Sequence, residues 1–552
     1  KNILEYLYLF GIMLMLAALP LSKYFMSVAQ FWLGGTVLLE FYKASALKSI
    51  LSKRPFEAKV VLAVPMVIFL FIDAFVSIFR KFLRKENLPA IILASIYLMH
   101  LAGLAFTSDY MYALKDLRIK LPILILPIIF SVSEPLKSTR FYNFLLLFIA
   151  AVFSATIICT GVYVRGNITD IRDISIFISH IRFGLLISLA FFILTYFIYR
   201  KDLFNNILRI VFVGLAAWFL IYLFFTASFT GLAIIIITSI ILLLYYVFNQ
   251  KRKFVNAGII GLLVIMILTG FFYIRSIYQD VNTVRDINLE NLDKYSDRGS
   301  VYWHDYSNKE TENGYYVWLY IANNELKEAW NERSSLDYNG KDKKGQLIKF
   351  TLIRYLTSKG LRKDAAGVNK LTEEDIKNIE NGIASIVYAE KPVFYVRIYK
   401  TIWALNRYQS TGNASGNSVL QRLEYWKASL GIIKNHWKLG VGTGDLPNAF
   451  EEQYSRMDTS LENKFQWRSH NQFLAIFVGF GILGLLWFIF ALIYPGWKLR
   501  KFHDYLYAVF FATIVLSMFT EDTIETQAGA TIFAFFSSLL LFGRSEDKPS
   551  KD

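Results

Sequence analysis

The residues best suited to chemistry lie around His470, where a long polar stretch gives way to an apolar segment. The run RSHNQF occupies positions 468–473, so Arg468 stands two residues before the histidine. A lone histidine in such a place is often structural, but an imidazole near an anionic site can act as a general base. We therefore interpret His470 as a candidate catalytic base.

Other ionisable residues stand inside or at the ends of apolar segments, where they are costly and commonly functional. Each one alone fits an interfacial anchor or an internal ion pair equally well. On the topology predicted below they gather on one side of the membrane, and as a set they predict a site. Besides Arg468 they are Arg118, His180, Arg182, Glu521, Asp522 and Glu525.

A metal site is not expected. None of the six histidines has the spacing of metal ligands, and the single cysteine, Cys159, lies in an apolar run, which excludes intrachain disulfides and cysteine-based metal sites. The glycine run at 440–444 is a weak nucleotide signal, because it follows a helical pattern, whereas a dinucleotide fingerprint follows a strand. We interpret this run as a tight turn.

The composition identifies the class of protein that carries these residues. Of 552 residues, 55% are hydrophobic and only 18% are charged, whereas soluble globular proteins have roughly 25% charged residues. Repeated apolar runs approach the roughly 20 residues that a helix needs to cross a bilayer. A soluble enzyme, a secreted disulfide scaffold and a disordered chain are excluded, and we predict an all-α polytopic membrane protein.

Thirteen apolar segments are visible, ten before a polar stretch of 195 residues at 275–469 and three after it. The first ten are 3–21, 24–42, 60–79, 88–106, 121–133, 141–164, 174–199, 207–225, 229–248 and 255–274. The last three are 473–494, 505–519 and 528–542. No sequence repeat of the kind found in many transporters is visible.

Basic residues indicate the orientation. The 59 Lys and Arg exceed the 43 Asp and Glu by 16, which in a membrane protein indicates cytoplasmic loops rather than nucleic-acid binding. Segment 60–79 has basic clusters on both flanks, so we expect both flanks in the cytoplasm and a re-entrant or interfacial segment. About twelve spans then remain. Omitting the short segment 121–133 instead would place the cluster at 80–85 outside, so the first solution is preferred.

Four regions follow from this topology. We expect a transmembrane bundle at 1–274 with about nine spans, an extracytoplasmic loop domain at 275–469, transmembrane helices within 470–543, and a cytoplasmic tail at 544–552. The loop domain is predicted to be mostly helical. A capping box at Thr372 predicts a helix that continues through Ile383, and Pro392 predicts the start of another that ends near Tyr408. A third helix, capped by Asn417 or Ser418, is predicted to be amphipathic. The apolar residues on one of its faces are Leu423, Trp426, Leu430, Ile433 and Trp437.

Several motifs together resemble the bacterial O-antigen ligase and polymerase superfamily. They are RLEYW at 422–426, GVGTGD at 440–445, SHNQF at 469–473 and GILG at 481–484. HIRFG at 180–184, RYLTSKG at 354–360 and SMFTEDTIETQAG at 517–529 are similar to ligase-like members from Bacteroidetes. The resemblance runs through most of the chain after Leu88 and implies a GT-C-like glycosyltransferase fold with about twelve transmembrane helices.

The resemblance also implies an activity. The chain would be a metal-independent, inverting glycosyltransferase without a cofactor, located in the bacterial inner membrane with its site facing the periplasm. It would move a glycan from undecaprenyl diphosphate to lipid A-core, and His470 would deprotonate the acceptor hydroxyl. A diphosphate calls for cations, and the fork of arginine suits phosphate. The candidates are Arg118, Arg182, Arg422 and Arg468.

The sequence departs from the family pattern at one place, and it leaves three alternative functions open. Family members usually carry a Ser-Arg pair where this chain has Ser228 and Phe229, so another arginine substitutes or the donor is held differently. An O-antigen polymerase or a protein O-glycan transferase would share the donor chemistry. A lipid-linked glycan transporter or flippase is the rival of another class, disfavoured by the single large loop and the lack of two similar halves.

Overall fold

The computed structural model describes residues 2–44, 63–166, 171–249, 252–285, 287–457, 459 and 461–545. These residues are mostly helical, and their one sheet is a two-stranded antiparallel hairpin of β1 (Thr311–Glu312) and β2 (Tyr315–Tyr316). Eight of the described helices are long and apolar enough to cross a membrane. The helix content and the candidate spans of the described residues therefore confirm the predicted class, an all-α polytopic membrane protein.

The chain forms two compact units. The first comprises Lys1–Gly166, Arg172–Ile241 and Arg422–Asp552, and the second comprises Asn167–Ile171 and Leu242–Gln421. Residues 422–469, which the sequence places in the loop domain, thus group with the apolar helices of the first unit. Residues 546–552 of the expected tail lie outside the described residues. Residues 60–62 of the segment expected to be re-entrant or interfacial also lie outside them.

Helices α1, α6, α8, α9, α10, α11, α12 and α21 have the length and hydropathy of membrane spans, and α22 and α23 are apolar but shorter. The bounds are α1 (Asn2–Leu21), α2 (Lys23–Ala44), α5 (Ala63–Phe82), α6 (Leu88–Ala102), α7 (Tyr110–Val132), α8 (Ser138–Val164), α9 (His180–Tyr199), α10 (Asn206–Phe225), α11 (Phe229–Asn249), α12 (Lys253–Asn282), α19 (Ser418–His436), α20 (Leu446–Arg456), α21 (Gln472–Lys498), α22 (Tyr505–Thr520) and α23 (Gln527–Phe542). In the first unit α7 packs against α6 and α23, and α21 packs against α6.

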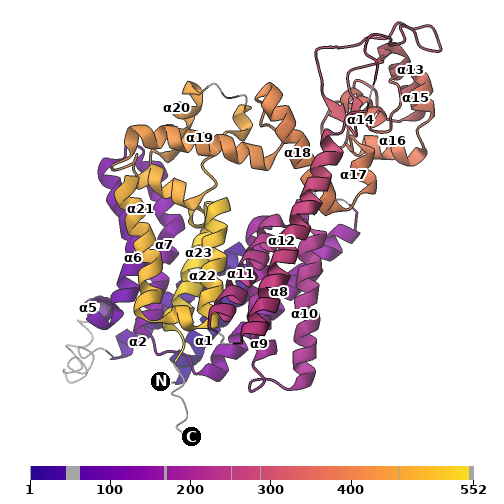
Figure 1. Ribbon diagram of the computed structural model, residues 1–552. Coiled ribbons are helices and arrows are strands. Elements are labelled where there is room, and N and C mark those ends of the chain that lie inside the picture. The colour runs from indigo at the N-terminus through magenta and orange to yellow at the C-terminus, as the bar shows by residue number, and fades with distance from the viewer. Residues whose placement is uncertain are drawn as a thin grey trace. The chain divides into compact units, whose positions relative to one another are not determined.

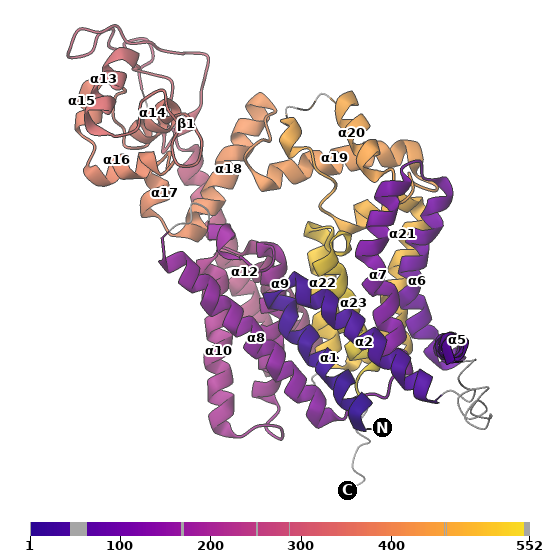
Figure 2. The same ribbon diagram turned by 180° about the vertical axis from the view of Figure 1, so that it is seen from behind.

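Helix α5 runs across the direction of its neighbours. Figures 1 and 2 show α5 along its own axis, whereas α6, α7 and α21 are seen lengthwise in both views. Its buried residues Leu70, Ala74 and Ile78 recur every fourth position, and large apolar side chains on the other faces, such as Phe69 and Phe75, are exposed. Helix α5 is therefore amphipathic and crosswise, and the re-entrant or interfacial placement of segment 60–79 stays a prediction.

Helix α7 is longer than the sequence suggested. The apolar segment was expected at 121–133, but the helix begins at Tyr110, with Asp109 accepting a hydrogen bond from the backbone N–H of Tyr112 as its N-cap. The preceding turns contain Asp116 and Lys120, which are both buried and lie 2.5 Å apart as an i,i+4 pair. Because the two charges compensate each other, the helix continues through a stretch that hydropathy alone reads as polar.

The glycine run at 440–444 packs against a break in α21. Gly481 has φ 63° and ψ −165° within that helix, so its neighbours lose their helical hydrogen bonds. The preceding loop supplies replacements: the N–H groups of Val441 and Gly442 donate to the carbonyls of Val478 and Gly479, and the N–H of Ile482 donates to Trp437. The predicted tight turn therefore also has a packing role.

Replacement of Gly440 by alanine should destabilise the protein. Gly440 has φ +74°, and a Cβ there would lie 2.3 Å from backbone atoms of α21, so overpacking of roughly 1–3 kcal/mol adds to the cost of the left-handed backbone. Gly412 is the matched control, because it has φ +69° but open space around its Cβ position. The thermal midpoint of the purified protein should fall clearly further for Gly440→Ala than for Gly412→Ala. Equal shifts would contradict the packing role.

The second unit contains the polar helices and a hydrophobic core of its own. The helices are α13 (Asn323–Arg333), α14 (Ile348–Ser358), α15 (Ala365–Asn369), α16 (Glu373–Glu380), α17 (Ile386–Glu390) and α18 (Val393–Thr411). Trp330, Tyr355 and Leu356 are buried at the centre of the core. The predicted capping box at Thr372 is present at the start of α16, and α18 begins directly after Pro392 as expected.

The amphipathic helix expected after residue 417 is α19, and Asn417 caps it by accepting hydrogen bonds from the N–H groups of Val419 and Leu420. The stripe predicted for this amphipathic helix is only partly buried. Ile433 is buried, whereas Leu430 and Trp437 are more than half exposed, and Leu420, Tyr425, Ala428 and Ile432 are buried as well.

Candidate functional site

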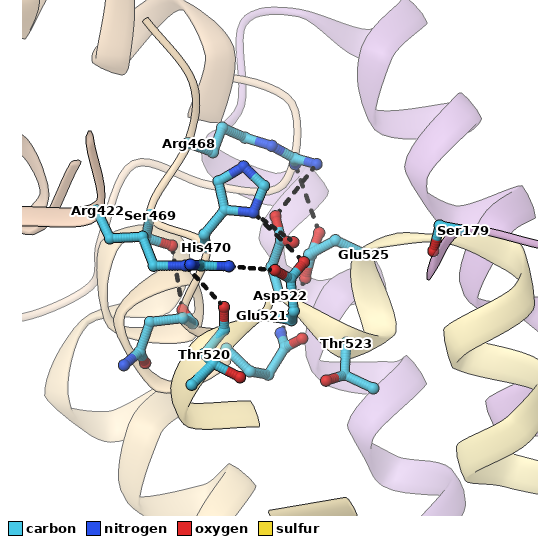
Figure 3. Close-up of polar contacts among 12 residues, drawn as sticks. Ser179, Arg422, Arg468, Ser469, His470, Thr520, Glu521, Asp522, Thr523 and Glu525 are labelled. Carbon is cyan, nitrogen blue, oxygen red and sulfur yellow. Dashed lines mark hydrogen bonds and ion pairs between the residues drawn. The ribbon is translucent and has the colours of Figure 1, made fainter. Parts of the chain in front are cut away.

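A short turn between α22 and α23 places three carboxyl groups together. Glu521, Asp522 and Glu525 follow the end of α22, and all three are buried. Thr526 then caps α23 by accepting a hydrogen bond from the N–H of Gly529. Three buried acids within five residues are costly unless cations or donors compensate them, and the surrounding helices supply such groups (Figure 3).

His470 lies in the turn before α21 and faces these acids. Its backbone is left-handed, with φ 44°, a conformation uncommon for a residue other than glycine. Neighbouring side chains hold the turn. The indole N–H of Trp426 donates to the carbonyl of Ser469, and Asn471 caps α21 while its amide donates to the carbonyl of Phe519.

The imidazole is oriented by two carboxylates. Its Nδ1 lies 3.4 Å from Oε2 of Glu521 and 3.9 Å from Oδ1 of Asp522, and its ring centroid lies 5.4 Å from that of Tyr425. The His470 side chain is 31% exposed, whereas that of Glu521 is 8% exposed. An Nδ1–H that donates to Glu521 leaves Nε2 with a lone pair, which is the arrangement of a histidine positioned to accept a proton.

Two arginines flank the histidine. The Nη2 of Arg422 lies 2.7 Å from Oε1 of Glu521, and its Nε donates to the carbonyl of Thr520. Arg468 is held more loosely. Its guanidinium lies 3.5 Å from Glu525 and 3.9 Å from Asp522, and its closest contact in the described structure is a 3.0 Å hydrogen bond to the hydroxyl of Tyr112.

Burial and these contacts act in opposite directions on the acids. Burial favours the neutral form of Glu521, but His470 and Arg422 together hold its pKa below the usual value. For Asp522 burial outweighs the more distant His470 and Arg468, so its pKa is raised. Burial also opposes the charge of Arg468, yet the carboxylates, Glu525 above all, keep its pKa above the ordinary value. An ionised Glu521 therefore faces His470.

A second layer of charge lies behind the acidic turn, on helices α6 and α7. Lys120, with a side chain that is 0% exposed, contacts Glu525 at 2.7 Å and Asp116 at 2.5 Å, and the Nδ1 of His100 lies 3.5 Å from Asp116. The amide of Gln472 donates to Glu525. These partners were not among the sequence candidates, although the i,i+4 spacing of Asp116 and Lys120 in an otherwise apolar region was a usable signal.

Six of the predicted site residues are brought together, and three are not. The six are Arg422, Arg468, His470, Glu521, Asp522 and Glu525. Arg118 is exposed on the face of α7 opposite Asp116 and Lys120. His180 and Arg182 lie in the first turn of α9, where Arg182 donates to the hydroxyl of Ser179. Ser179 lies apart from the histidine cluster in Figure 3.

One group of side chains in the described part of the chain has donor atoms close enough to hold a metal ion. It consists of His470, Glu521 and Asp522, with ligand atoms within 4.8 Å of one another. Arg422 and Arg468 contact the same two carboxylates, so their positive charges oppose a divalent cation. The donor set therefore gives no positive support for a metal, and metal independence stays a prediction.

The apolar helices indicate a multi-pass membrane protein, and the charged cluster places two arginines close to the candidate base. Comparison with known proteins gives the family. A model described as O-Antigen ligase matches residues 382–489, and this match supports membership of the O-antigen ligase superfamily. No curated protein matches the chain. Members of this family are glycosyltransferase-like enzymes of lipopolysaccharide biosynthesis.

The matched region contributes one part of the cluster. It includes Arg422, Arg468 and His470, and it ends within α21, before the acidic turn. Glu521 and Asp522 therefore join the site through the fold rather than through the matched segment.

Proposed function

We propose that the protein transfers a glycan from undecaprenyl diphosphate to lipid A-core at the periplasmic face of the bacterial inner membrane. On this proposal, the loop at 275–469 and the His470 cluster face the periplasm, and both termini face the cytoplasm. Membership of the superfamily supports the reaction class, and the cluster supports the assignment of roles to residues.

The observation that carries the proposal is the contact between His470 and Glu521. Glu521 is ionised, buried and 3.4 Å from Nδ1, so it fixes the tautomer that leaves Nε2 free. It also stabilises the imidazolium that forms when the ring takes a proton. Asp522, at 3.9 Å, adds a second nearby carboxyl group.

In the proposed transfer step one glycosidic bond forms and the bond to the diphosphate breaks. Nε2 of His470 takes the proton of an acceptor hydroxyl as its oxygen attacks the anomeric carbon of the donor glycan. The new glycosidic bond forms while the bond from that carbon to the phosphate oxygen breaks, and undecaprenyl diphosphate leaves. A single displacement inverts the anomeric configuration. Because the diphosphate is already a stabilised leaving group, a metal is not required.

The arginines would bind the donor. Arg422 and Arg468 have side chains that are 23% and 26% exposed, so both can reach a phosphate group from the same cluster that holds His470. Arginine suits this role through its bidentate fork. Arg118, His180 and Arg182 remain candidates for parts of the donor farther from the reacting carbon.

Turnover by the purified protein tests the proposal. We expect the full chain in lipid nanodiscs to convert a lipid-linked glycan and lipid A-core into ligated product and undecaprenyl diphosphate, with the same rate after EDTA treatment. A second lipid-linked glycan as the preferred acceptor would indicate a polymerase, and a peptide acceptor a protein O-glycan transferase. Donor binding without turnover would indicate a carrier or flippase and refute the proposal.

A further inference from the structure

Lys120, the buried lysine behind the acidic turn, takes no part in the transfer step described above. Its contacts indicate a different role. Lys120 and Arg468 both approach the same oxygen, Oε2 of Glu525, at 2.7 Å and 3.5 Å. The shorter contact is made by Lys120, whose side chain is 0% exposed and is also held by Asp116. Arg468 is the more exposed of the two cations, and its distance to Glu525 is the longer one.

Glu525 needs a permanent counter-charge. Its side chain is 4% exposed, and a buried carboxylate that loses its cation is strongly destabilised. Its other oxygen accepts a hydrogen bond from the amide of Gln472, which also accepts one from the N–H of Ile524. Lys120 and Gln472 thus satisfy Glu525 without help from Arg468.

We propose that Lys120 is a positioning residue that neutralises Glu525 and thereby leaves the guanidinium of Arg468 available to an anionic phosphate of the donor. This inference rests on the proposed function. Without Lys120, Glu525 would have Arg468 as its nearest remaining cation, and a phosphate would have to compete with a buried carboxylate for that arginine. With Lys120 in place, the ion pairs of Arg468 that a phosphate has to displace among the described residues are the long ones of 3.5 Å and 3.9 Å.

The test variant is Asp116→Asn combined with Lys120→Met, which removes both members of an ion pair and leaves no isolated charge on α7. Binding of undecaprenyl diphosphate to the full chain in nanodiscs is measured. We expect the Kd to rise about tenfold or more, with kcat at saturating donor little changed. Adding Glu525→Gln should restore the affinity, because the competing carboxylate is gone. In an Arg468→Ala background, the double variant should cause no further loss.

Lys115→Met is the matched control, because Lys115 lies on the same helix, is exposed and makes no ion pair within the described residues. It should leave the Kd unchanged. A folded Asp116→Asn/Lys120→Met protein with wild-type affinity would overturn the inference, and so would an equal loss in the Arg468→Ala background. Should that double variant fail to fold, Glu525→Gln alone decides: affinity equal to or above wild type supports the inference, and a several-fold loss refutes it.

Failure of the proposed function would look different. In that case wild-type protein would not bind undecaprenyl diphosphate, or Arg468→Ala would bind it as well as wild type does. The inference alone fails when Arg468→Ala weakens binding and the loss of Lys120 does not.

Discussion

Replacement of His470 by asparagine should lower the rate of glycan transfer about 100-fold or more, the usual contribution of acid–base catalysis, with expression and donor binding unchanged. Asparagine is the informative substitute, because it tolerates the left-handed backbone that His470 adopts at φ 44°.

The control for this variant is His503→Asn, which removes an exposed histidine between α21 and α22. It should retain full activity. In cells, a strain that depends on His470→Asn should accumulate lipid-linked glycan and make lipid A-core without attached polymer. Normal polymer attachment would remove His470 from the mechanism, and lost donor binding with an unchanged rate per bound donor would make its role structural.

Replacement of Arg422 by alanine should weaken donor use by about 2–3 kcal/mol, the lower part of the range for a truncated buried charge pair, because the Arg422 side chain is 23% exposed. Lysine should restore little, since it keeps the charge but cannot contact Glu521 and a phosphate with a planar fork. The measurement is the Kd for undecaprenyl diphosphate together with kcat/KM for the donor.

Arg456→Ala is the control for general charge loss, because Arg456 pairs with Glu452 and both side chains are more than half exposed. It should have little effect. Full donor affinity in Arg422→Ala would contradict a donor-binding role. The same assay applied to Arg182→Ala separates its two interpretations: strong loss would assign it to the donor, and wild-type affinity would make it a structural residue of α9.

The fold was largely predictable because bilayer-length apolar runs leave few alternatives to helices. The errors have a common cause, which is that hydropathy counts residues and does not see their partners. The start of α7 was missed because Asp116 and Lys120 compensate each other. The apolar spacing in α19 did not show which of its residues are buried, since Ile433 is buried while Leu430 and Trp437 are exposed.

The site was predictable in its residue types but not in its pairings. Ionisable residues next to apolar segments are conspicuous, so His470, Arg468 and the acidic turn were found. Their partners come from distant parts of the chain: Lys120 and Glu525 are 405 positions apart, and Arg422 and Glu521 are 99 positions apart. Such pairs are defined only by tertiary packing, and the sequence contains no local signal for them.

The break in α21 also bears on how substrates gain access to the site. A glycine break in a long helix usually permits bending. Here Gly481 lies against the carbonyl of Lys438, and the backbone groups freed by the break are bonded to the loop between α19 and α20. Flexing α21 at this point would rupture three of those bonds at once. On the proposed function, α21 therefore serves as a rigid wall beside Arg468 and His470, and a lipid-borne donor would reach them without bending of this helix.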